Sequence, residues 1–134
     1  MKLTQILETC LYVEDLAKAE QFYSEILGFE LYSKADGRHI FFRCGNSMLL
    51  LFDPRKTMEH GKSVPPHGAY GEGHVAFSVS EKELAAWREH LAAHNIAIES
   101  EITWPGGGKS IYFRDPDNNS LELATPQTWN FSQS

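Results

Sequence analysis

His74 occupies a position from which a strand can present a side chain for chemistry. It opens the segment 74–79, in which small or polar residues alternate with apolar ones. This period of two is typical of a strand with two different faces, and it places the imidazole opposite the apolar side chains. A histidine in such a place is either a metal ligand or, more often, a hydrogen-bonded structural residue. Two carboxylates on other predicted strands, Glu8 and Glu122, favour the ligand interpretation.

The first half of the chain contains the elements that must position Glu8. Residues 7–13 alternate in polarity and predict a strand. Asp15 is a suitable helix N-cap and Gly28 a suitable C-terminal stop, and apolar residues spaced three and four apart between them predict an amphipathic helix. Three further strands are predicted over residues 29–34, 39–44 and 47–52. The predicted order is strand, helix and three strands.

The second half of the chain repeats this order. After the strand over 74–79, Ser80 and Glu83 form a capping box, and the predicted helix ends at Asn95. Three more strands are predicted over residues 96–102, 109–114 and 120–124. Equivalent positions recur at offsets of 66 to 71 residues, which indicates one supersecondary unit used twice. We therefore expect an α+β fold in which tandem βαβββ modules form a half-barrel around a shared cavity.

The boundaries of these modules follow from the same pattern. We expect residues 1–134 to form a single domain, with module one over about residues 5–53 and module two over about 73–126. The segment between them, about residues 54–72, is rich in proline and glycine and has no periodicity. A segment of this kind is usually a module boundary, a lid, or both.

Composition and charge exclude several classes of partner. The chain has 134 residues and a net charge of −6 without any run of Lys or Arg, which argues against nucleic acid and anionic membranes. It has neither the apolar core of a signal peptide nor a transmembrane run. Its two cysteines, Cys10 and Cys44, lie in apolar runs. A disulfide framework is therefore not expected, and a reducing cytoplasm is the expected location.

Three groups of residues together form a family signature that covers nearly the whole chain. They are Leu11–Leu16 followed by Phe22–Phe29, then Gly73–Phe77, and finally Tyr112–Asn118 with Leu121–Leu123. In these segments the chain resembles the vicinal oxygen chelate superfamily. That superfamily includes glyoxalase I, the fosfomycin resistance proteins, bleomycin-sequestering proteins, methylmalonyl-CoA epimerase and extradiol dioxygenases.

The resemblance implies a divalent metal bound at fixed places in the two modules. Those places fall on Glu8 of the first strand, His74 of the second module and Glu122 of the last strand. Many members carry His or Gln in place of Glu8. Glyoxalase-like members add a fourth ligand, whose place falls here on Leu49 or Leu50, and neither can bind a metal. The sequence is therefore closer to members that use three ligands.

One imidazole and two carboxylates would leave coordination positions free for water and two substrate oxygens. Such oxygen-rich ligation favours Mn(II), Fe(II), Ni(II) or Mg(II), with Zn(II) as a further candidate. The ion would act as a Lewis acid, with Glu122 as the catalytic carboxylate. The alternative is a metal-free protein that sequesters a small toxic compound, as bleomycin resistance proteins do. In that case arginines would neutralise the carboxylates, and the candidates are Arg38, Arg43 and Arg114.

Other residues of the predicted inner face complete the candidate site. Tyr12 is a candidate catalytic proton donor, and its alternative role is packing. Four residues are candidate substrate contacts, namely Cys10, Phe52, Ser78 and Trp104. Cys10 is otherwise a small buried apolar residue.

The predicted activity is that of a metal-dependent lyase, isomerase, transferase or oxygenase that acts on a small molecule. We also expect a homodimer, because each open sheet has edges and an apolar face that a short chain does not cover.

Overall fold

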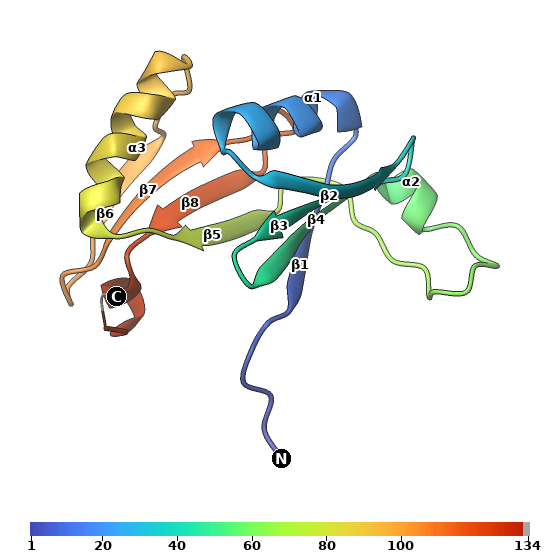
Figure 1. Ribbon diagram of the computed structural model, residues 1–134, viewed down its shortest axis with the longest axis horizontal. Coiled ribbons are helices and arrows are strands. Elements are labelled where there is room, and N and C mark those ends of the chain that lie inside the picture. Colours follow the sequence, from blue (N-terminus) through green and yellow to red (C-terminus); the bar gives the residue numbers. More distant parts are fainter. Residues whose placement is uncertain (133–134) are drawn as a thin grey trace. The chain divides into compact units, whose positions relative to one another are not determined.

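The computed structural model describes residues 1–132 and confirms the α+β class, with two four-stranded sheets that each carry helices. The chain divides into two compact units, Met1–Gly73 and His74–Ser134. Within each unit the main helix lies on one face of its own sheet (Figure 1). Both sheets are open, and a cavity shared between modules stays a prediction.

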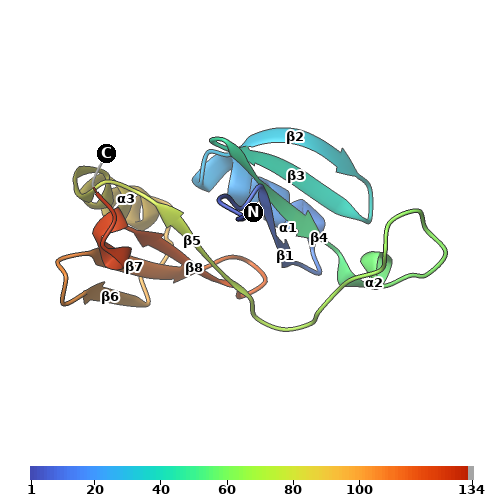
Figure 2. The same cartoon turned by 90° about the horizontal axis from the view of Figure 1, so that it is seen from below.

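The first unit has the predicted order of elements. They are β1 (Glu8–Tyr12), α1 (Leu16–Gln21), a π-helical turn (Phe22–Ile26), β2 (Glu30–Ala35), β3 (His39–Cys44), β4 (Ser47–Phe52) and α2 (Pro54–Thr57). The strands lie in the order β1-β4-β3-β2 (Figure 2), with β1 parallel to β4 and the other neighbours antiparallel.

The first helix forms where its caps predict. The side chain of Asp15 accepts a hydrogen bond from the Lys18 amide at 3.0 Å, and Gly28 ends the helical segment with a φ of +75°. Phe22–Ile26 continues α1 as a π-helical turn. Tyr23 of this turn and Phe42 of β3 are fully buried and stack at 6.0 Å, so aromatic packing holds the helical segment on the sheet.

The second unit repeats the arrangement. Its elements are β5 (His74–Ser78), α3 (Glu81–Ala93), β6 (Ser100–Thr103), β7 (Lys109–Arg114), β8 (Ser120–Ala124) and a 3₁₀ turn (Pro126–Trp129). The strands lie in the order β5-β8-β7-β6. Ser80 caps α3 by accepting from the Glu83 amide at 3.1 Å, and Asn95 follows the helix with a φ of +59°. Leu84 and Leu91 of α3 are buried, as are the apolar residues of β8.

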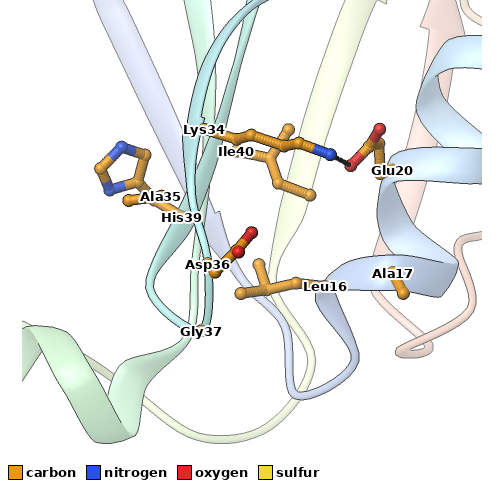
Figure 3. A pocket seen from close by; sticks show the side chains of 9 residues that line it. All are labelled: Leu16, Ala17, Glu20, Lys34, Ala35, Asp36, Gly37, His39 and Ile40. Carbon is orange, nitrogen blue, oxygen red and sulfur yellow. Dashed lines mark hydrogen bonds and ion pairs between the residues drawn. The ribbon is translucent and has the colours of Figure 1, made fainter.

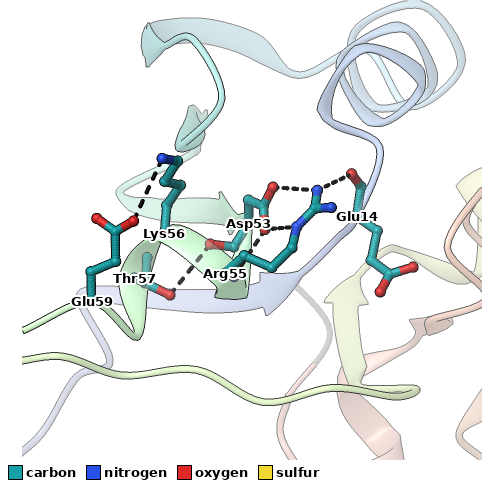
Figure 4. Close-up of polar contacts among 6 residues, drawn as sticks. All are labelled: Glu14, Asp53, Arg55, Lys56, Thr57 and Glu59. Atoms are coloured by element: carbon teal, nitrogen blue, oxygen red, sulfur yellow. Dashed lines mark hydrogen bonds and ion pairs between the residues drawn. The ribbon is translucent and has the colours of Figure 1, made fainter.

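Two local expectations were wrong. The strand predicted over 96–102 begins only at Ser100, because the Ile96 amide still bonds the Leu91 carbonyl of α3 at 2.9 Å. The segment expected to lack structure begins with α2, which Asp53 caps by accepting from the Arg55 amide at 2.9 Å (Figure 4). Aspartate followed by Pro54 is an N-cap with proline at the first helical position, a local signal that does not depend on periodicity.

Within residues 1–132, none of the helices has the length and apolar character that a membrane crossing would require.

Candidate metal centre

Strand register places the predicted ligands of the second unit on one face of its sheet. His74 of β5 lies beside Ser120 of β8, and Ala76 lies beside Glu122. On the other side of β8, Glu122 faces Tyr112 of β7. Because side chains alternate along a strand, those of His74, Glu122 and Tyr112 project from the same face.

The two predicted ligands of this unit are in direct contact. His74 Nε2 lies 3.2 Å from Glu122 Oε1, and His74 Nδ1 lies 2.9 Å from the Ser120 carbonyl oxygen. A carbonyl only accepts hydrogen bonds, so Nδ1 carries a hydrogen. In the neutral ring the lone pair is then on Nε2 and faces the carboxylate. The imidazole is half exposed, whereas the Glu122 side chain is buried.

This donor pair fits a divalent cation. A lone pair and a carboxylate oxygen that face each other need a proton or a cation to hold them together. Two ligands at about 2.1 Å from one ion, roughly at right angles, are about 3 Å apart. The distance of 3.2 Å between His74 Nε2 and Glu122 Oε1 matches that separation. A protonated imidazole in an ion pair with the carboxylate is the other arrangement that the distance allows.

A second contact with Glu122 was not predicted. The Ser110 hydroxyl donates to Glu122 Oε2 at 2.5 Å and accepts from Trp104 Nε1 at 2.9 Å. Ser110 is buried at 1% exposure. In the sequence it lies two residues before Tyr112 on the same face of the strand, so the alternation of polar residues along β7 was the available signal.

Tyr112 also lies close to this pair. Its ring stacks near that of His74, with centroids 6.3 Å apart and planes inclined by 23°. Burial raises the pKa of the Tyr112 phenol, and the Glu122 charge and a hydrogen bond to that carboxylate raise it further. Tyr112 therefore remains protonated beside the carboxylate.

Glu8 is the first residue of β1 and is exposed. Its side chain has no hydrogen-bond or ion-pair partner within the described part of the chain, so the carboxylate is available as a ligand. Glu8 opens β1 as His74 opens β5.

The strand register also decides which of Leu49 and Leu50 occupies the fourth ligand place. Leu50 of β4 lies beside Cys10 of β1, just as Glu122 of β8 lies beside Ala76 of β5. Leu50 is therefore the position in the first unit that corresponds to Glu122 in the second.

Residues 1–132 contain no group of three or more His, Cys, Asp or Glu side chains that could hold a metal ion. His74 and Glu122 belong to the second unit, and the structure brings them together, whereas Glu8 belongs to the first unit. The three-ligand set therefore stays a prediction.

The predicted proton donor Tyr12 has an unexpected partner. Its hydroxyl lies 2.6 Å from Nδ1 of His67, a residue of the segment that follows α2. Burial, together with the charge of Cys10 and a hydrogen bond to it, raises the pKa of Tyr12 to about 12. Tyr12 is thus a hydrogen-bond donor at neutral pH. The ring of Phe52 packs edge-on against His67 at 4.8 Å. Nothing in the sequence pattern of residues 58–73 indicated this contact.

The remaining predicted contacts are spread over both units. Phe52 is buried and Cys10 half-buried in the first unit, on the sheet face that carries Tyr12. In the second unit Ser78 is exposed and Trp104 is half-buried.

The arginines that were alternative partners of the carboxylates contact other groups. Arg38 contacts His39 and lies over the Phe52 ring, Arg43 lies over Tyr32, and Arg114 donates to Glu99. In the described residues Glu122 instead contacts His74 and Ser110. The carboxylate is therefore held by His74, the Ser110 hydroxyl and the Tyr112 phenol, and by none of these arginines.

A separate pocket of about 220 Å³ lies between α1 and the β2–β3 hairpin of the first unit. Figure 3 shows Lys34 of β2 reaching Glu20 of α1 across it, at 2.9 Å. Both side chains are partly exposed, and none of the predicted site residues lines this pocket.

The comparisons with known proteins agree with the fold and with the family that the sequence resembles. Residues 5–123 match the family model of the Glyoxalase/Bleomycin resistance protein/Dioxygenase superfamily. Metallothiol transferase FosB of Staphylococcus saprophyticus is 31% identical over 115 residues, which cover 84% of this chain and 71% of that protein. Glutathione transferase FosA of Serratia marcescens is 31% identical over 114 residues, which cover 84% of this chain and 74% of that protein.

One solved structure is similar to this chain over nearly the whole length of both proteins. The crystal structure of lactoylglutathione lyase from Agrobacterium tumefaciens superimposes with a TM-score of 0.94 and 39% identity, covering 98% of this chain and 100% of that one. The match of the family model to most of the chain, together with these relatives, establishes the family. The chain belongs to the Glyoxalase/Bleomycin resistance protein/Dioxygenase superfamily, the vicinal oxygen chelate group that its sequence resembles.

Proposed function

We propose that this protein is a metal-dependent enzyme that binds a small substrate through oxygen atoms at a divalent ion. His74 and Glu122 would hold the ion, and Glu8 would complete the ligand set. The observation that carries the proposal is the distance of 3.2 Å between His74 Nε2 and Glu122 Oε1, with the other ring nitrogen bonded to a carbonyl. When bound, the ion supplies Lewis-acid polarisation of a substrate oxygen.

We further propose lyase or transferase chemistry with a thiol as substrate or co-substrate. The support is that relatives carry the names metallothiol transferase, glutathione transferase and lactoylglutathione lyase. In this chain Ser110 holds the Glu122 carboxylate in place. The pKa of Tyr12, raised to about 12, keeps its phenol protonated. With the His67 Nδ1 hydrogen donated to the phenol oxygen, the Tyr12 proton would be available to bond a substrate oxygen. Phe52 and Trp104 would contact the apolar part of the substrate.

We propose that the protein works as a homodimer in a reducing cytoplasm. A dimer would let Glu8 of one protomer join His74 and Glu122 of its partner, and the free thiols Cys10 and Cys44 suit a reducing environment. Light scattering at micromolar concentration checks the assembly, and a monomer would contradict this part of the proposal.

A metal-free binding protein is the second candidate, favoured by the aromatic side chains on the first sheet. The rings of His39 and Phe41 stack at 3.9 Å, and those of Phe41 and Phe52 meet edge-on at 5.5 Å. Such rings suit the binding of a flat apolar compound without turnover.

Metal binding separates the two candidates. Purified protein is stripped of metal, and Mn(II), Ni(II) and Zn(II) are titrated into it by calorimetry. The proteins compared are the native chain, His74→Ala and His94→Ala. His94 is an exposed histidine that follows α3 and serves as the matched control. We expect His74→Ala to abolish tight binding and His94→Ala to leave it unchanged.

The loaded protein is then tested with glyoxals, epoxides and catechols, each with and without glutathione. Turnover that depends on both the metal and His74 supports the enzyme. Absence of metal binding by the native chain would leave the sequestering protein as the remaining candidate.

A further inference from the structure

The two oxygens of the Glu122 carboxylate have different partners. Oε1 faces His74 Nε2 at 3.2 Å, whereas Oε2 accepts the hydrogen bond of the Ser110 hydroxyl at 2.5 Å. A free carboxylate can bind an ion through either oxygen or through both. Here Oε2 already accepts one hydrogen bond, which favours Oε1 for an ion beside His74.

The direction of the Ser110 hydrogen bond is determined by Trp104. The indole N–H is a donor only, and it points at Ser110 Oγ at 2.9 Å. Ser110 Oγ must therefore accept from Trp104, and its single proton is free to point at Glu122 Oε2. Because Ser110 is 1% exposed, water does not compete for this proton. The indole thus orients the hydroxyl, and the hydroxyl orients the carboxylate.

The loop that carries Trp104 is itself held firmly. The Trp104 amide bonds the Gly108 carbonyl at 2.7 Å, and the Gly107 amide bonds the Trp104 carbonyl at 2.9 Å. Gly107 has a φ of +96°, and a Cβ on Gly108 would lie 2.2 Å from the Thr128 backbone nitrogen. Both glycines are needed, the first by its conformation and the second by close packing. The indole donor therefore starts from a fixed backbone.

We propose that Trp104 and Ser110 are positioning residues that reserve Glu122 Oε2 and present Oε1 alone to the metal. This inference rests on the metal site of the proposed function. Binding through one carboxylate oxygen leaves an additional coordination position for substrate. Partners that orient a ligand in this way usually contribute ten- to a hundredfold in metal affinity.

The test measures Mn(II) affinity by calorimetry on the metal-free protein, so that no substrate is needed. The variants are Ser110→Ala, which removes the hydroxyl, Ser110→Thr, which keeps it, and Trp104→Phe, which keeps the aromatic ring without its N–H. The matched controls are Ser100→Ala on β6 and Trp87→Phe on α3, which lie outside this chain of hydrogen bonds. Thermal unfolding of each metal-free variant checks that it is folded.

We expect Ser110→Ala to weaken Mn(II) binding by about ten- to a hundredfold and Trp104→Phe to weaken it by less. Ser110→Thr should keep the Mn(II) affinity of the native chain, and the two control substitutions should leave that affinity unchanged. In the Ser110→Ala background, Trp104→Phe should have no further effect, because the indole acts only through the hydroxyl. If the two side chains acted only through packing, the losses of Mn(II) affinity in the two single variants would add in the double variant.

Native affinity in Ser110→Ala, with affinity lost in Glu122→Gln, would overturn this inference and leave the metal site intact. Additive losses in the double variant would also overturn it. Failure of the native chain to bind any of Mn(II), Ni(II) and Zn(II) would overturn the proposed function, and the inference with it.

Discussion

Replacing Tyr12 by Phe removes one hydroxyl whose surroundings are well defined. That hydroxyl lies 2.6 Å from His67 Nδ1, and burial is the main reason why its pKa is raised from 10.0 to about 12. The substitution deletes both the hydrogen bond and the titration, and it keeps the ring that packs 6.3 Å from Phe52. Any change in stability therefore reports on the hydroxyl.

The expected magnitude has two parts. An intramolecular hydrogen bond contributes about 1 kcal/mol, so Tyr12→Phe should lower the free energy of unfolding by about that amount at pH 8. The second part comes from the pKa of Tyr12, which is raised to about 12 in the folded protein; because this hydroxyl is partly exposed, solvent screening makes its contribution small. Because the folded pKa lies above the unfolded one, this term favours folding fully below pH 10 and is lost as the pH rises from 10 towards 12.

The assay is urea unfolding of both proteins between pH 8 and pH 11. Other groups titrate in this range in both proteins, so only the difference between them is interpreted. The stability of the native protein should fall more steeply above pH 10 than that of Tyr12→Phe. Tyr32→Phe is the matched control, because the Tyr32 side chain is 58% exposed.

Absorbance of the phenolate gives a direct check. The difference between the titrations of the native protein and Tyr12→Phe should place the pKa of Tyr12 near 12. A pKa close to 10 would refute the argument that burial keeps this phenol protonated, and with it the proposed role of Tyr12 as a hydrogen-bond donor to substrate.

Three further substitutions test the site and the scaffold. Glu122→Gln should lower metal-dependent turnover by about a hundredfold or more, measured with the first active substrate, because a neutral amide replaces the ligand carboxylate. Cys10→Ala should retain most of that turnover, and the reverse pattern would indicate that Cys10 is a nucleophile. Asp53→Ala should lower the free energy of unfolding by about 1 kcal/mol through loss of the α2 cap, whereas Asp53→Asn should keep most of the cap. Hydrogen bonds from Arg55 lower the pKa of Asp53 (Figure 4), so its charge stabilises the fold above about pH 4 and this contribution is lost as the pH falls further. Urea unfolding of the native protein and Asp53→Ala at pH 7 and pH 3 measures this contribution. If the substitution lowers the free energy of unfolding equally at both pH values, the stabilising role of the Asp53 charge is contradicted.

Local patterns in the sequence predicted most of the secondary structure. The alternation in residues 7–13 and 74–79 became β1 and β5, and the caps Asp15 and Ser80 both accept the expected backbone hydrogen bonds. These features depend on neighbours three or four residues apart, so the sequence contains all the information that they need. The strand predicted to begin at 96 was wrong because a strand begins where a partner pairs with it, and no local pattern records that.

The site divides in the same way between sequence and tertiary structure. The resemblance to the superfamily selected Glu8, His74 and Glu122 as ligands, and of these the structure brings His74 and Glu122 to 3.2 Å. The hydrogen bonds of Ser110 with Glu122 and of Tyr12 with His67 join residues 12 and 55 positions apart. Strand register and the path of the segment after α2 place these partners together. Periodicity and spacing by themselves predicted the two modules, and the resemblance to the vicinal oxygen chelate superfamily supplied the candidate ligands. Only the tertiary structure decided which oxygen of the Glu122 carboxylate faces His74 and which accepts from Ser110, because that depends on groups which register and side-chain packing bring from other strands and loops.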